Sequence, residues 1–225
     1  MAAGLAGGFA LSAGAQTVGK IEGVSVYAYG QPPGAARRAT FENFPVASNE
    51  VLETVKDGGL KVRFLDDTEL VMGAESLLTV DNSVFNPDRA SGKLALSFTK
   101  GAFRFVTGKV RKDDVVLTTR SATIGIRGTD WTMSINARGD TTVNLREGGA
   151  LVTSTANGSQ VTLGPRTSVT VPFGGGVGPA APFPALYDGA VGDRTVDASL
   201  ISGRNFAPDP SNDAQAGSQR SSSSQ

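Results

Sequence analysis

Side chains in the stretch 118–135 alternate between apolar and polar, and the alternation changes phase once. Before Gly128 the apolar residues stand at even positions, and after it they stand at odd positions, beginning with Trp131. Successive residues of a β-strand face opposite ways, so a change of phase within a strand requires a bulge or a corner. We therefore expect a strand on each side of Gly128, Thr129 and Asp130, with a corner at these three residues.

The same period of two recurs over most of the chain between Val18 and Val171. Runs such as 60–64 and 94–98 alternate apolar with polar residues, and Asp, Asn and Gly fill the gaps between runs. About a dozen short strands at roughly 8–12-residue spacing predict an all-β fold. This spacing fits a twisted, β-solenoid-like stack and a sandwich-like stack equally, and the uneven run lengths argue against a strict repeat.

Composition limits the chemistry that such a fold could carry. The 225 residues include no Cys and no His, which excludes disulfides, Cys/His metal sites and His-based catalytic triads. Because 21 basic and 21 acidic residues give a formal net charge of +0, no nucleic-acid partner is expected. We expect no catalytic residues, no cofactor and no metal, and predict that the chain is not an enzyme.

Composition also divides the chain into segments. Residues 1–15 are small and apolar and end in an Ala-Gly-Ala motif, which is typical of the end of a secretory signal and predicts a periplasmic or secreted protein; a Gly/Ala-rich leader is the alternative. No later run approaches the ~20 apolar residues of a stable membrane span. The predicted segments are a signal-peptide remnant at 1–15, a β domain at 16–173, a Gly/Pro linker with a weakly ordered segment at 174–202, and a disordered tail at 203–225.

Two groups of acidic residues suggest metal binding or acid/base chemistry. Asp66, Asp67 and Glu69 share one expected turn that we place in solvent, and we interpret them as turn residues because catalytic carboxylates need different environments across a cleft. A calcium loop would need more oxygen ligands at regular spacing. A second, equally weak calcium candidate consists of Asp81, Asn82, Asn86 and Asp88.

The segment Gly125 to Gly128 has the composition of a phosphate-binding loop. Such a loop needs a following helix, whereas a strand is expected here, so we interpret both glycines as structural, allowing positive φ or close backbone approach. Arg127 is expected either to contact a partner or to pair with Asp130 or turn carbonyls. Trp131 is expected in the core. The possible partner contacts are Arg127, Asp66 and Asp67.

Three blocks of the sequence resemble the FecR domain, an exported regulatory module. They are LKVRFLDDTELVMGAESLLTVD at 60–81, LALSFTKGAFRFVTGK at 94–109, and TTRSATIGIRGTDWTMSI followed by TTVNLREGGALV at 118–135 and 141–152. Asp67 stands where the family usually has Gly, so that turn is expected to differ. The third block carries the family's signature, here formed by Gly125, Arg127, Gly128, Thr129, Asp130 and Trp131.

The resemblance implies an all-β, twisted, solenoid-like fold in the bacterial cell envelope, with a role in signalling or recognition. The family's regulators carry an anti-sigma segment and a transmembrane helix ahead of this domain, and this sequence shows neither, so a stand-alone exported form is expected. The leading hypothesis is a non-enzymatic module that binds an envelope protein or polymer. The alternative is a structural or assembly component of an envelope or surface fibre, and the oligomeric state is left open.

Overall fold

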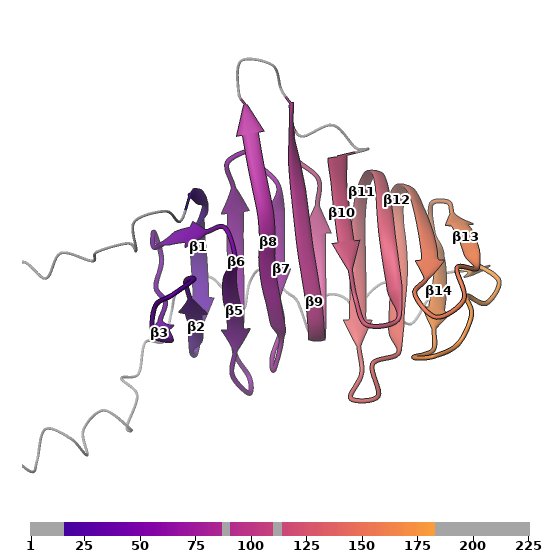
Figure 1. Cartoon of the computed structure of the whole chain (residues 1–225), viewed down its shortest axis with the longest axis horizontal. Helices are drawn as coiled ribbons and strands as arrows, with labels where there is room; N and C mark the ends of the chain where they lie inside the picture. The colour runs from indigo at the N-terminus through magenta and orange to yellow at the C-terminus, as the bar shows by residue number, and fades with distance from the viewer. Residues whose placement is uncertain (1–15, 87–90, 110–113, 183–225) are drawn as a thin grey trace, which may run out of the picture.

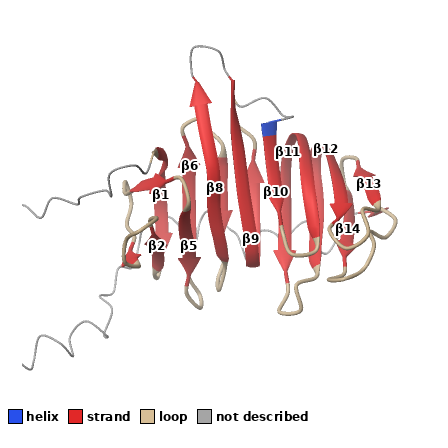
Figure 2. Ribbon diagram, viewed as in Figure 1, coloured by secondary structure: helices blue, strands red, loops and turns tan. Residues whose placement is uncertain are grey.

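The computed structural model describes residues 16–86, 91–109 and 114–182, and within a few strands it describes the backbone only. This part of the chain forms fifteen strands and, apart from one helical residue at Asp114, no helix (Figure 2). The predicted all-β class is confirmed. The strands are β1 (Thr17–Ser25), β2 (Ala28–Gln31), β3 (Arg38–Ala39), β4 (Pro45–Ala47), β5 (Glu50–Thr54), β6 (Gly59–Phe64), β7 (Glu69–Met72), β8 (Leu77–Asn86), β9 (Ser91–Val106), β10 (Val115–Thr118), β11 (Ala122–Ile135), β12 (Thr141–Ser154), β13 (Gln160–Leu163), β14 (Thr167–Val171) and β15 (Ala181–Pro182).

The strands pair in two ladders that stack along the long axis of the molecule (Figure 1). Ladder A has the order β3-β2-β5-β8-β9-β10-β11-β12-β13. Ladder B has the order β4-β1-β6-β7-β9-β11-β12-β14-β15. The chain winds repeatedly from one ladder to the other, so both the solenoid-like and the sandwich-like descriptions apply.

Three long strands, β9, β11 and β12, belong to both ladders. The first part of β9 pairs with β8 and β10, and its last part pairs with β7 and β11. Within the range of β9 the sequence predicts two short strands with a turn at Gly101, whereas β9 runs through Gly101 as one strand. Gly101 has a φ of 110°, and Gly128 of β11 and Gly148 of β12 also have positive φ. A glycine with positive φ bends each strand at the point where it changes ladder.

The two ladders enclose one hydrophobic core. Their inward-facing residues, such as Leu52, Leu70 and Leu78, are fully buried. Burial of such side chains contributes roughly 1.5–3 kcal/mol each to stability. Val177 also packs against the core, and Ala181–Pro182 pairs with β14, so part of the predicted linker is attached to the stack. The expectations for residues 1–15, 183–202 and 203–225 lie outside the described residues.

Candidate functional site

The signature residues occupy the strand β11, which changes ladder between them. Its pairing with β12 shifts register between Arg127 and Asp130 and again before Trp131, and Gly128 has a φ of 57°. The phase change in the sequence therefore marks an irregularity in the strand, as expected. The side chains of Arg127 and Thr129 are not among those described, so the role of Arg127 stays a prediction.

Trp131 lies in the core where β9 and β11 pair. Its side chain is 1% exposed. The indole stacks on Phe105, with ring centroids 5.4 Å apart, and meets Phe98 edge to face at 6.3 Å. Trp131 is thus enclosed by aromatic side chains of β9 and is not placed to meet a ligand.

Asp130 pairs with an arginine that the sequence did not suggest. Arg104 of β9 donates from Nε to one carboxylate oxygen of Asp130 at 3.0 Å and from Nη2 to the other at 2.8 Å. Asp130 of β11 stands opposite Val106 of β9. Arg104 lies two residues before Val106, on the same face, and is therefore a diagonal neighbour of Asp130. The alternation of Phe103 and Phe105 shows that Arg104 faces outward, but only the pairing of β9 with β11 brings it to Asp130.

The acidic turn between β6 and β7 is not exposed as a whole. Asp66 is 3% exposed, and its carboxylate accepts hydrogen bonds from the backbone N–H of Thr68 at 3.2 Å and from its hydroxyl at 2.5 Å. This burial corrects the expectation that the whole turn lies in solvent, whereas the possible partner contact of Asp66 stays a prediction. Asp67 is exposed and pairs with Lys109 at 2.5 Å, which lowers the pKa of its carboxyl. Its φ of 66° is in the left-handed region, so Asp67 takes the conformation that favours the family's glycine.

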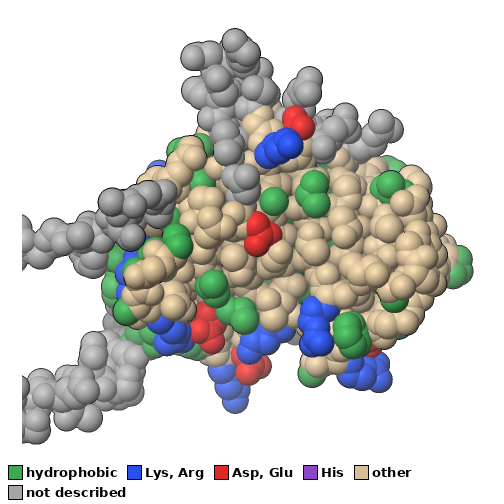
Figure 3. Space-filling model, in the orientation of Figure 1, with side chains coloured by type: hydrophobic (Ala, Val, Ile, Leu, Met, Phe, Trp, Pro, Cys, Tyr) green, Lys and Arg blue, Asp and Glu red, His purple; other side chains and the backbone are tan. Residues whose placement is uncertain are grey.

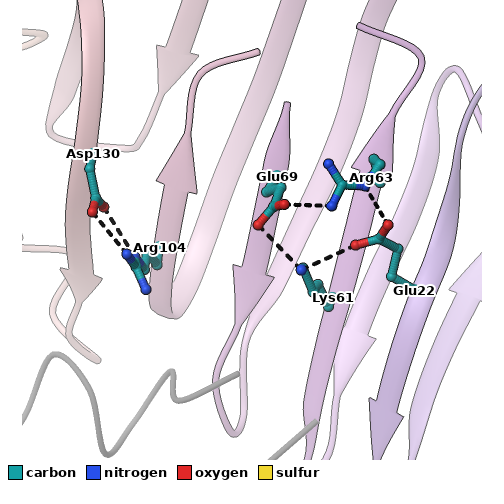
Figure 4. A network of polar contacts seen from close by, with 6 residues as sticks. All are labelled: Glu22, Lys61, Arg63, Glu69, Arg104 and Asp130. Carbon is teal, nitrogen blue, oxygen red and sulfur yellow. Dashed lines mark hydrogen bonds and ion pairs between the residues drawn. The ribbon is translucent and has the colours of Figure 1, made fainter. Parts of the chain in front are cut away.

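An ionic network covers the outer surface of ladder B beside this turn (Figure 4). Lys61 lies 3.2 Å from both Glu22 and Glu69, and Arg63 also pairs with both of these carboxylates. Burial would raise the pKa of Glu22, but hydrogen bonds from Arg63 and Lys61 outweigh it and hold that pKa below its ordinary value. These four charges therefore satisfy one another, which favours a structural role.

No metal centre is visible in the described ranges, where no group of three or more acidic residues could hold an ion. In the second calcium candidate, Asp81 accepts a hydrogen bond from the hydroxyl of Ser97 at 2.6 Å. The side chains of Asn82 and Asn86 and the whole of Asp88 lie outside the described part.

The outer face of ladder A has a different character. Few charged side chains lie in its centre, and they gather toward the ends of the strands (Figure 3). Val116, Gly125 and Leu151 stand opposite one another on β10, β11 and β12. Val116 and Leu151 are each 43% exposed, and a Cβ placed on Gly125 would meet no atom within 4 Å. We call this arrangement the Gly125 notch: two exposed apolar side chains about 10 Å apart, separated by an empty glycine position.

The notch revises the structural interpretation of Gly125. Its φ is not positive, its pairing with both neighbours is regular, and no close backbone approach requires a glycine. A glycine inside a strand weakens it, and such a residue marks a bulge, a bend or a place where another molecule approaches closely. Neither a bulge nor a bend accounts for Gly125, whose Cβ position is open. The sequence motif indicates Gly125 as a candidate. It does not predict the open space around Gly125, because that space depends on which strands flank β11.

Residues 50–151 match the family described as FecR protein. The chain contains a FecR-like domain. The matched region of this FecR-like domain begins in β5, ends in β12 and includes the signature strand and the Gly125 notch. A comparison with curated proteins finds no match. The described part contains no helix able to cross a membrane.

Two crystal structures of a proposed anti-sigma factor from Parabacteroides distasonis ATCC 8503 are similar to the FecR-like chain. One, at 2.50 Å resolution, has a TM-score of 0.50 and 17% identity, and the match covers 73% of this chain and 70% of that chain. The other, at 1.65 Å, has a TM-score of 0.49 and 15% identity, covering 61% of this chain and only 62% of that chain. At these identities the first likeness concerns the fold alone.

Proposed function

We propose that this FecR-like chain is an exported, non-enzymatic regulatory module that recognises an envelope protein or polymer through the outer face of ladder A. The family and its fold indicate a regulatory module. The Gly125 notch is the observation that carries the proposal for the contact surface. The notch lies in the family signature, is open, and is flanked by two apolar side chains with room between them.

The charge distribution supports the same surface. The four charges at the centre of ladder B, on Glu22, Lys61, Arg63 and Glu69, are engaged in ion pairs within the molecule. On ladder A, one row next to the notch consists of Thr118, Thr123 and Thr153. Hydroxyl groups and exposed aliphatic side chains suit a partner that is held by shape, apolar contact and hydrogen bonds. Such a surface needs no net charge, in keeping with the balanced composition of the chain.

Filling the notch tests this proposal. Gly125→Val should fold normally and lose capture of a partner from envelope extract, because the added side chain occupies the space between Val116 and Leu151. Gly164→Val is the matched control, since Gly164 also has open space around its Cβ position and no positive φ. The proposal is wrong if wild-type protein captures nothing that survives competition by the untagged chain, or if Gly125→Val captures as well as wild type.

Assembly into a fibre is the alternative, and it would use the ends of the stack. The end strands β3, β4, β13 and β15 have two to four residues each, and short edge strands limit pairing with another chain. We therefore expect sedimentation of the purified chain to show a monomer at all concentrations. Polymers that grow with concentration would favour assembly instead.

Export is tested separately by fractionating cells that produce the tagged full-length protein. We expect the chain outside the cytoplasm. Accumulation in the cytoplasm, together with a cytoplasmic marker protein, would contradict the proposed location. The binding proposal would still be tested by the notch variants.

A further inference from the structure

A basic and aromatic patch lies where the strand ends of β10, β11 and β14 come together. Phe173 is 50% exposed, although it is a large apolar side chain. The guanidinium of Arg120 lies over the Phe173 ring, 4.6 Å from its centroid. The ring also lies against Gly139, where an added Cβ would come within 3.6 Å of it. With the neighbouring Arg138, these residues form what we call the Arg120 patch.

Asp140 holds the patch in one geometry. One of its carboxylate oxygens accepts the backbone N–H of Phe173 at 3.0 Å, and the other accepts the side-chain amide of Asn136 at 2.8 Å and Nε of Arg138 at 3.1 Å. Hydrogen bonding by Asn136 and by the Phe173 backbone lowers the pKa of Asp140. The hairpin tip, Arg138 and Phe173 are therefore fixed relative to one another, which reduces the entropy lost on binding.

The charge of the patch is not neutralised within the described part of the molecule. Asp140 pairs with Arg138 at 2.9 Å, and the Arg138 side chain is still 82% exposed. Arg120 makes no ion pair with a described carboxylate. Arg37 provides an informative contrast, because it also lies over an aromatic ring, 3.4 Å from the centroid of Tyr29, but pairs with Glu53 at 2.9 Å. Two guanidinium groups beside one carboxylate leave an excess positive charge next to an exposed ring.

We propose that the Arg120 patch binds an acidic protein segment, whose carboxylates pair with Arg120 and Arg138 while an apolar side chain contacts Phe173. Arginine and aromatic residues are enriched in the parts of interfaces that carry most of the binding energy. A protein segment fits better than an acidic sugar polymer, because a sugar would stack on an open ring face and Arg120 covers one face of Phe173.

This inference rests on the proposed function as a binding module and adds the chemical class of the partner. Val116 of the Gly125 notch and Arg120 are four residues apart along the chain, and because the chain turns after Thr118 they lie closer together than the ~13 Å of a fully extended segment. A short extended segment with one apolar and several acidic residues could therefore contact both sites.

The experiment uses the full chain and a fluorescein-labelled peptide of alternating Glu and Phe, with a Gln-for-Glu peptide of the same length as control. Fluorescence anisotropy should show binding of the Glu peptide, weakening as salt is added. Arg120→Gln should weaken that binding by about tenfold through the lost charge pair. Arg37→Gln is the matched control and should bind as wild type does. Circular dichroism of both variants checks that each is folded.

Three results would overturn the inference: equal affinity of Arg120→Gln and wild type, equal losses in Arg120→Gln and Arg37→Gln, or tighter binding of polygalacturonate than of the Glu peptide. Failure of the proposed function looks different. The Glu peptide could bind in an Arg120-dependent way while the chain captures nothing from envelope extract that the untagged chain displaces. That result would support the patch proposal and contradict the proposed envelope function. If capture depends on Gly125 while Arg120→Gln neither captures less nor binds the peptide less, only the patch proposal fails.

Discussion

Gly125 and Gly128 stand three residues apart in one strand, and the structure uses them in opposite ways. Gly128 has a φ of 57° at the shift of register, where a side chain with a Cβ would be strained. Gly125 has neither a positive φ nor a close neighbour. One glycine is needed for the conformation of the backbone, and the other leaves a space on the surface.

Valine at each position should separate the two roles. We expect Gly128→Val to lower the free energy of unfolding by at least ~1–2 kcal/mol, because a β-branched residue disfavours positive φ. Gly125→Val should be neutral or should stabilise the strand by up to about 1 kcal/mol, because glycine weakens strand interiors. Urea unfolding followed by circular dichroism measures both. Equal destabilisation by the two substitutions would contradict these assignments.

Glu50 is a buried carboxyl with incomplete compensation. Its side chain is 1% exposed, accepts the backbone N–H of Ala47 at 2.8 Å and lies 3.4 Å from Arg38. Burial raises the pKa of Glu50, and it outweighs the opposing effects of the Ala47 hydrogen bond and the Arg38 charge. The fold therefore favours the protonated carboxyl more than the unfolded chain does.

Glu50→Gln should show this in the dependence of stability on pH. A raised pKa means that the folded wild type retains its proton to higher pH, so wild-type stability declines as pH rises from 4.5, the ordinary value, through the raised value. The neutral Gln variant lacks this decline. We expect the melting temperature of Glu50→Gln to rise relative to that of wild type as the pH increases from 4 to 7. Thermal unfolding in buffers of equal ionic strength measures this difference. A difference that does not change with pH would refute the expectation.

At the scale of the elements, the Arg104–Asp130 pair joins β9 to β11 where β11 enters ladder B. Both side chains are partly buried, at 30% and 20% exposed, and the contact is bidentate. We expect a double-mutant cycle with Arg104→Met and Asp130→Asn to give a coupling energy of about 0.5–1 kcal/mol, shrinking in high salt. Zero coupling at low salt would show that the pair adds nothing to the pairing of these strands.

The same pair shows what the sequence predicts about the structure and what it does not. Period-two alternation predicts the runs that become β6, β9, β11 and β12, because side-chain direction in a strand is a local property. It does not predict that one strand serves two ladders or which arginine reaches Asp130, because both depend on cross-strand neighbours that are distant in sequence. Arg127 is the nearer candidate along the chain, whereas Arg104 is the partner in space. The same limit applies to the Gly125 notch, whose walls come from β10 and β12.

At the scale of the whole molecule, the shared strands should make the two ladders unfold together. β9, β11 and β12 belong to both ladders and line one core, so neither ladder can open at these shared strands without breaking the other. We expect the fluorescence of Trp131, which reports on the crossing of β9 and β11, and far-ultraviolet circular dichroism to give coincident urea transitions. Separate midpoints would show that the ladders are independent units.

The stack also has a mechanical consequence. β1 lies near one end of it and β15 at the other, with the strands upright between them (Figure 1). Tension applied between Thr17 and Pro182 would therefore act along the stack and across the strands, so it would load backbone hydrogen bonds a few at a time and peel strands from the ends. Strands pulled lengthwise past one another would instead share the load among all their bonds. If the chain is tethered at both ends in an envelope, it is built to yield stepwise under low force.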